Sequence, residues 1–163
     1  MERNRLGPET KAIIEAIHGT ENCADFYQLG FWTMERIGKT NIYKVFITAI
    51  PHAIAMPAVA ADVTTQLSIP FPHRWLRVHF YHTTAAFVVS FEPLRITIRR
   101  EVTTMLPVEF LDELFCEFDI TDVIGIEKFG EGFEYEAGVW NIILNTVATE
   151  LVFPLFYIQK LEA

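Results

Sequence analysis

Residues 94–101 read LRITIRRE, and this stretch decides the fold class. Apolar residues occupy positions 94, 96 and 98, while Arg95, Thr97 and Arg99 alternate with them. Such alternation is typical of a β-strand with one face on an apolar core and the other in water. We therefore expect a sheet with one wet face, and that face is basic.

The pattern continues on both sides of this strand. NIYKVFIT (41–48) predicts a strand, and the Pro-containing stretch 49–72 predicts an extended loop with a strand near 63–69. Further strands are expected at 74–82, 86–91, 122–128, 132–137, 139–145 and 147–158. Pro154 should place the last strand at an edge or a bulge. For residues 20–40 the sequence predicts only a loop with one irregular turn.

Two segments have helical spacing. In GPETKAIIEAIH (7–18) the isoleucines at 13, 14 and 17 fall on one helical face, and in LPVEFLDELFCEF (106–118) positions 108, 111, 115 and 118 do so. The expected fold class is α+β but mostly β: an antiparallel β-sandwich or barrel with an N-terminal helix and the 106–118 helix packed on it. We expect a single domain, 1–163, with a helix and arm over 1–40 and a β-sandwich core over 41–163.

Bulk composition restricts the function classes. The 163 residues carry a net charge of −8, which argues against phosphate-neutralising nucleic-acid binding as the main activity. We expect no membrane span and no secretory signal, hence a cytoplasmic origin. Cys23 and Cys116 have no CxxC spacing and are expected to be reduced thiols.

Chemical motifs are missing from the sequence. His73, His79 and His82 lie on one expected strand at spacings that do not converge, so they are interpreted, with His52, as partly buried ring side chains and not as zinc ligands. The serines lie in no GxSxG elbow, and the glycines form no phosphate-binding loop. We expect no metal, no cofactor and no enzymatic activity.

Charge is unevenly distributed along the chain. Residues 71–100 carry a net charge of +4 and residues 109–136 a net charge of −9. These charges either neutralise each other within one chain or join neighbouring subunits head to tail. Candidate subunit-interface residues are Arg74, Arg77, Arg95, Arg99 and Arg100. Candidate residues of an acidic lining or interface are Glu109, Asp112, Glu113, Glu117, Asp119 and Asp122.

Three stretches, GKTNIYKVFI (38–47), FEPLRITIRREVTTMLPVEFLDEL (91–114) and NTVATELVFPLFYIQ (145–159), resemble segments of the tail tube proteins of contractile phages. The resemblance covers about half of the chain. It implies a six-membered ring of β-sandwich subunits, related in fold to secretion-system tubes, that stacks into a tube through which DNA passes as non-specific cargo. It also implies contacts with neighbouring virion proteins, a location in the virion tail and assembly in the host cytoplasm.

Three hypotheses therefore stand. The first is a self-assembling structural protein of a phage tail tube or a related tail or neck ring. The second is a small β-barrel or sandwich whose Phe-rich interior binds an apolar ligand. The third is an enzyme that uses paired carboxylates, Glu109 with Glu113 or Asp112 with Glu113, on the 106–118 helix.

Overall fold

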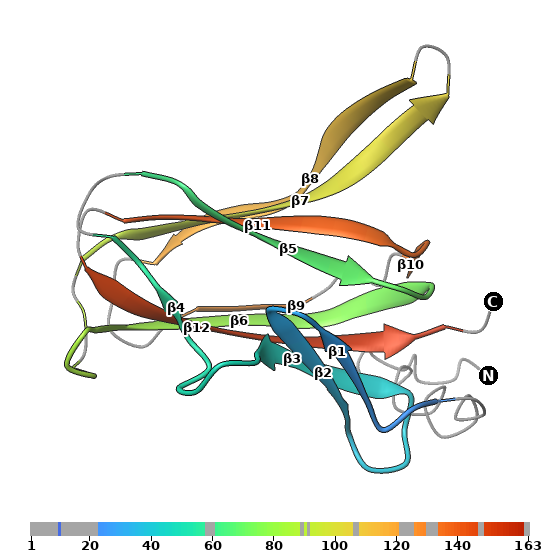
Figure 1. Ribbon diagram of the computed structural model, residues 1–163, viewed down its shortest axis with the longest axis horizontal. Helices are drawn as coiled ribbons and strands as arrows, with labels where there is room; N and C mark the ends of the chain where they lie inside the picture. Colours follow the sequence, from blue (N-terminus) through green and yellow to red (C-terminus); the bar gives the residue numbers. More distant parts are fainter. Residues whose placement is uncertain are drawn as a thin grey trace, which may run out of the picture.

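The fold consists of two antiparallel β-sheets that face each other across an apolar core (Figure 1). The computed structural model describes Thr10 and residues 23–57, 61–88, 90, 92–105, 108–120, 126–129, 134–146 and 149–161, and for 102–120 and 126–129 it describes the strands alone. The mostly-β, antiparallel class expected from the sequence is confirmed. The helix expected over 7–18 lies, apart from Thr10, outside the described residues.

Within the described residues the chain forms twelve strands. They are β1 (Phe26–Leu29), β2 (Trp32–Arg36), β3 (Ile42–Ile47), β4 (Ile54–Ala55), β5 (Val63–Ile69), β6 (His73–Thr84), β7 (Leu94–Met105), β8 (Val108–Ile120), β9 (Ile126–Phe129), β10 (Glu134–Tyr135), β11 (Gly138–Thr146) and β12 (Glu150–Lys160). Sheet A has the order β1-β2-β3-β12-β6-β10, with β4 paired to β12 and β9 to β6. Sheet B has the order β5-β11-β7-β8.

Aromatic side chains fill the space between the sheets. Trp75 of sheet A meets Trp140 of sheet B at a ring-centroid distance of 5.0 Å, and Phe156 packs on both Trp75 and Trp32 at 5.2 and 5.3 Å. All four side chains are almost fully buried. These four rings lie at the centre of the core. Large buried rings supply much of the free energy gained when a small core is buried.

Strands β1 and β2 correct the expectation of a loop over residues 20–40. They form a tight hairpin, with Leu29 opposite Trp32 and Gly30 in the left-handed region (φ 73°). Glycine adopts this conformation at little cost, so it supports the turn. Trp32 and Met34 are fully buried, which makes the hairpin part of the core.

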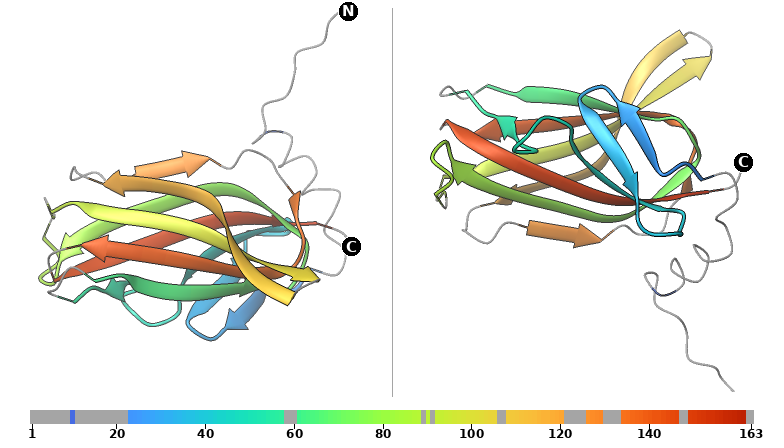
Figure 2. Two further views of the ribbon diagram at one scale, coloured as in Figure 1. Left: turned by 90° about the horizontal axis from the view of Figure 1, so that it is seen from above. Right: turned by 60° about the horizontal axis from the view of Figure 1, so that its bottom comes forward.

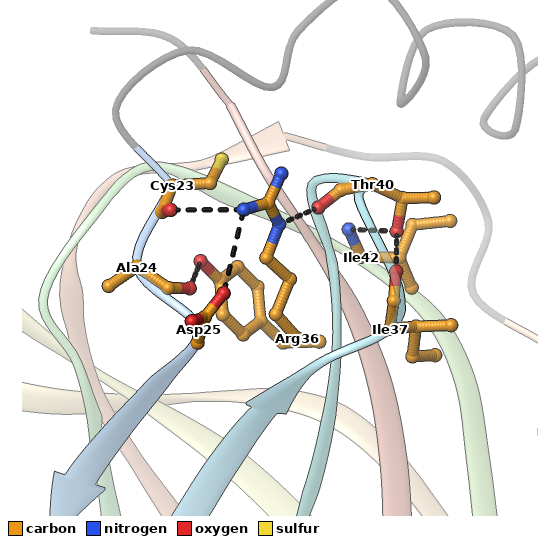
Figure 3. Close-up of polar contacts among 8 residues, drawn as sticks. Cys23, Ala24, Asp25, Arg36, Ile37, Thr40 and Ile42 are labelled. Atoms are coloured by element: carbon orange, nitrogen blue, oxygen red, sulfur yellow. Dashed lines mark hydrogen bonds and ion pairs between the residues drawn. The ribbon is translucent and has the colours of Figure 1, made fainter.

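Arg36 anchors the beginning of this hairpin (Figure 3). Its guanidinium donates to the carbonyl of Thr40 at 2.6 Å and to that of Cys23 at 3.2 Å, while Asp25 lies 3.8 Å away. The Tyr43 hydroxyl donates to the carbonyl of Ala24 at 2.6 Å, and burial raises the pKa of this phenol. These bonds fix the entry into β1 against β3.

The helix expected over 106–118 is wrong, because that segment forms β8. Its whole length pairs with β7, from Leu94 opposite Ile120 to Met105 opposite Val108. The segment contains two apolar patterns: one of helical spacing over its whole length, and one that alternates with acidic residues through positions 116, 118 and 120. Positions 116, 118 and 120 lie opposite Ile98, Ile96 and Leu94 of β7, and the register shifts beyond Ile98. The strand forms because backbone groups of β8 find hydrogen-bond partners along the edge of β7.

Two further expectations change. The strand expected over 86–91 is wrong where the structure describes it, because residues 85–87 form a turn and a bend after β6 and residue 88 is not in a strand. The last strand lies centrally in sheet A, although Pro154 itself sits where β12 lacks a partner on one side, between the β4 pairing at Val152 and the β3 pairing at Leu155. This interruption accommodates a residue without an N–H group.

Candidate functional site

A groove of about 710 Å³ lies on the outer face of sheet A, the face turned away from sheet B. Along each strand, the residues that line the groove alternate with residues that point into the core. Phe46 is half-buried between the fully buried Val45 and Ile47, and Tyr81 lies between the buried Phe80 and His82. The groove therefore uses the second face of the same strands that build the core.

Ring and aliphatic side chains from three adjacent strands form the floor. Leu155 of β12 lies opposite Phe46 of β3 on one side and His79 of β6 on the other. Phe153 lies opposite Tyr81, with a centroid distance of 6.1 Å between their rings. Cross-strand neighbours on one face pack side by side, so the floor is a continuous row of rings.

Two loops border this floor at one end of the sheet. Because β3 and β6 both run antiparallel to β12, their carboxyl ends lie at the same end of sheet A (Figure 1). The loop after β3 contributes Pro51 and His52, and the turn after β6 contributes Phe87. Large apolar side chains are exposed on both loops: Ile50 is 86% and Phe87 61% exposed.

Both loops hold a bulky residue in the left-handed region. His52 has φ 66° and Phe87 has φ 62°. Hydrogen bonds maintain the conformation: His52 Nδ1 lies 2.7 Å from the carbonyl of Ile47, and the Phe87 N–H donates to the carbonyl of Thr84 at 3.0 Å. Non-glycine residues in this region are strained, and such strain concentrates at binding sites.

One side of the groove is charged. Lys44 and Glu35 form an exposed ion pair at 3.8 Å, and the Lys44 ammonium lies 5.5 Å from the centre of the Phe46 ring. Opposite charges that are exposed to water contribute little to stability, so they remain free to bind a ligand's polar groups. The groove thus combines an apolar floor with hydrogen-bonding groups at its side, the usual make-up of a ligand site.

A buried polar cluster lies behind the turn that carries Phe87. The Ser90 hydroxyl donates to one carboxylate oxygen of Glu150, and His82 Nδ1 lies 3.0 Å from the other. All three residues are at most 2% exposed. The serine bonds the carboxylate and not the imidazole, so this is not the nucleophile–base arrangement of a hydrolase. The cluster ties the end of β6 to the start of β12.

The histidines do not gather at one site. His73 and His82 are fully buried, whereas His52 and His79 line the groove. His73 accepts a hydrogen bond from Trp140 Nε1 at 3.0 Å, so its own Nδ1 donates to the carbonyl of Phe71 at 2.9 Å. Burial lowers its pKa to about 4, and the nearby Arg100 adds to this effect. Within the described residues, no three His, Cys, Asp or Glu side chains are grouped as metal ligands would be.

The candidate interface arginines divide between the sheets: Arg74 and Arg77 lie on β6, and Arg95, Arg99 and Arg100 lie on β7. Arg74 donates to Glu134 at 2.7 Å and to Gln159 at 3.0 Å. Arg77 lies 5.9 Å from the Tyr157 ring centre. Arg100 donates to the carbonyl of Glu136 at 3.1 Å and packs over Tyr135 and Trp140. Arg74, Arg77, Arg95 and Arg100 therefore all have contacts within the chain.

The candidate acidic residues from Glu109 to Asp119 lie on β8, and Asp122 lies outside the described residues. The β7–β8 register puts Asp119 opposite Arg95 and Glu113 opposite Arg100. Asp112 lies opposite Glu101. The acid–base hypothesis required Glu109, Asp112 and Glu113 to lie on a helix, but this segment forms the strand β8.

The groove is the feature that sequence reasoning missed. Its residues come from β3, β6, β12 and two loops, and no motif joins them. The one available signal was the occurrence of apolar residues on both faces of 41–48 and 147–158, which predicts that some large side chains point away from the core.

Comparisons with known proteins leave the family open. No protein-family model and no curated protein matches the chain. Among solved structures, the CBM22-1 and GH10 modules of xylanase 10B from Clostridium thermocellum, complexed with xylohexaose, are 14% identical over 85% of this chain, with a TM-score of 0.37. The chain spans 25% of that xylanase. A family 16 carbohydrate-binding module is 6% identical, with coverages of 81% and 89% and a TM-score of 0.31. Likenesses this distant carry no functional argument.

The described residues contain no helix of the length and apolarity that crossing a bilayer requires.

Proposed function

We propose that this protein is a binding domain that takes an elongated ligand into the groove on the outer face of sheet A. The observation that carries the proposal is the row of half-buried rings, Phe46, Phe153 and Tyr81, between two loops with left-handed His52 and Phe87. A folded chain gains no stability by holding Phe87 exposed in a strained conformation, whereas a ligand contact would account for it.

The ligand class follows from the groove's own chemistry. The groove is open to solvent, so one side of a bound ligand stays in water. Sugar rings suit this setting, because a pyranose has an apolar C–H face that packs on aromatic rings and hydroxyl groups that reach Glu35, Lys44 and water. A wholly apolar molecule would instead need an enclosed site, whereas this groove is open to solvent. We therefore propose a chain of neutral sugar rings.

Isothermal titration calorimetry with a panel of soluble neutral oligosaccharides tests the proposal. Phe87→Ala should weaken binding about tenfold or more, the loss typical of removing a ring from a binding site. Phe26→Ala is the matched control, because Phe26 is 58% exposed against 61% for Phe87 and lies on β1, outside the groove lining. Absence of binding across the panel, or equal affinities of the two variants, would overturn the proposal.

A second candidate is the self-assembling subunit of a phage tail tube or of a related tail or neck ring. The observation that favours it is that both sheets end in strands, β1, β5 and β8, that the described residues leave unpaired on one side. Such edges allow sheets of neighbouring subunits to join. This proposal places the protein in the virion tail, with copies of itself and other virion proteins as partners and DNA as passing cargo.

Electron microscopy of the purified protein tests the second candidate, which expects six-membered rings or stacked tubes. It also expects that reversing the charge of Arg95 and Arg99 together weakens assembly more than folding. Single particles of one chain's size at every salt and protein concentration would count against it.

A further inference from the structure

We infer that two copies of this chain join through the free edge of β5 and form a two-fold dimer with one continuous sheet. This inference goes beyond both functions proposed above. Within the described part of the chain, β5 pairs with β11 on one side and with no strand on the other. Unpaired backbone N–H and C=O groups along a strand are a template for another strand.

β5 differs from the other free edges in length and charge. Its sequence, VTTQLSI (63–69), contains no charged residue and no proline. β8 is longer but carries five acidic residues, β1 and β9 have only four residues each, and β10 has two. Charges on an edge strand prevent pairing, since two β8 strands would bring acids together. β5 lacks this protection.

The pattern of β5 is complementary to itself. A two-fold axis at Gln66 pairs Thr64 with Ser68 of the other copy and Val63 with Ile69. Exposed Thr64, Gln66 and Ser68 then form one polar row, and the more buried Val63, Thr65, Leu67 and Ile69 form a second row that extends the core. Antiparallel pairing is what a two-fold axis perpendicular to the sheet produces for identical strands.

The β5 edge lies along one side of the sandwich (Figure 2, left). Seven strand residues extend only about 24 Å, so the edge is smaller than a standard interface of about 800 Å² per partner and should give a weak dimer. A concentration-dependent dimer is the expected result.

Sedimentation equilibrium of the full chain over a wide concentration range provides the first test. The mass should rise from 18.7 kDa to about twice that value. Thr64→Lys with Ser68→Lys should hold it at one chain, because lysines on an edge block pairing. Ala49→Lys with Ala85→Lys adds the same charge at exposed turn and bend positions and should dimerise like the unmodified chain. Circular dichroism checks that both variants fold.

Disulfide cross-linking tests the register. In a chain with Cys23 and Cys116 replaced by serine, Gln66→Cys lies on the axis and should cross-link to its counterpart upon oxidation. Thr64→Cys lies opposite Ser68 of the other copy, too far from its counterpart, and should not. A monomer at all concentrations, rings larger than a dimer, dimers in the β5 lysine variant, or equal cross-linking of the two cysteine variants would each overturn the inference. Oligosaccharide binding is measured separately, so failure here leaves the groove proposal intact.

Discussion

Protonation of His73 should destabilise the fold as the pH falls from about 6.5 to about 4. The imidazole is fully buried, and both of its nitrogens have partners only in the neutral form: Nδ1 donates to the carbonyl of Phe71, and Nε2 accepts from Trp140. A proton on Nε2 would break the second bond and place a charge in the core, which is why burial lowers the pKa to about 4.

The sign and size follow from linkage. The unfolded chain binds the proton near pH 6.5 and the folded chain only near pH 4, so the unfolded state binds more protons between these values and acid favours it. At about 1.4 kcal/mol per pH unit, the free energy of unfolding should fall by about 2 kcal/mol between pH 7 and 5 and by about 3 kcal/mol between pH 7 and 4. Below pH 4 the contribution levels off.

Urea denaturation followed by tryptophan fluorescence measures this loss. Other groups titrate in the same range, so the informative quantity is the difference between the unmodified chain and His73→Gln at each pH. Glutamine is neutral throughout, and the difference should therefore shrink by about 3 kcal/mol from pH 7 to 4. A difference that is independent of pH would refute the buried, neutral histidine.

Three more predictions concern single contacts. Arg36→Met should lower the free energy of unfolding by about 2 kcal/mol, because two carbonyls lose a charged donor, whereas Asp25→Asn, whose carboxylate is 89% exposed, should change it by less than about 0.5 kcal/mol. Phe87→Gly should raise the unfolding free energy by up to about 1 kcal/mol, since glycine relieves the left-handed strain, while oligosaccharide affinity falls in calorimetry. Glu150→Leu should cost about 3 kcal/mol or more in urea denaturation, because it leaves His82 and Ser90 buried without their acceptor.

The strands that the sequence predicts well are those with one apolar face. Alternation in 94–101 and in 63–69 identifies β7 and β5 with little error, and burial of Leu94, Ile96 and Ile98 confirms the core face of β7. Alternation can be read from the segment's own sequence, because successive side chains of a strand point to opposite faces whichever strands lie beside it.

Segments whose structure depends on distant partners were predicted wrongly. The 108–120 sequence has helical spacing over its length and alternation only through 116, 118 and 120, so the strand depends on pairing with the neighbouring β7. The β1–β2 hairpin depends on Gly30 in a left-handed turn and on burial of Trp32 by β3 and β12, neither of which has a local periodicity. The groove was beyond sequence reasoning for the same reason, because register across three strands brings Phe46, Leu155 and His79 together.

Charge segregation along the chain has a different meaning once the register of β7 and β8 is known. A net of +4 over residues 71–100 and −9 over 109–136 suggested either neutralisation within one chain or contacts between chains. The β7–β8 hairpin folds one segment onto the other, with Arg95 opposite Asp119 and Arg100 opposite Glu113, and Arg74 reaches Glu134 from β6. Cross-strand pairs of opposite charge stabilise a sheet modestly, by about 0.2–1 kcal/mol each. The register thus places residues of opposite charge at paired positions within the monomer, and the case for association rests more on the uncharged edge of β5 than on the arginines.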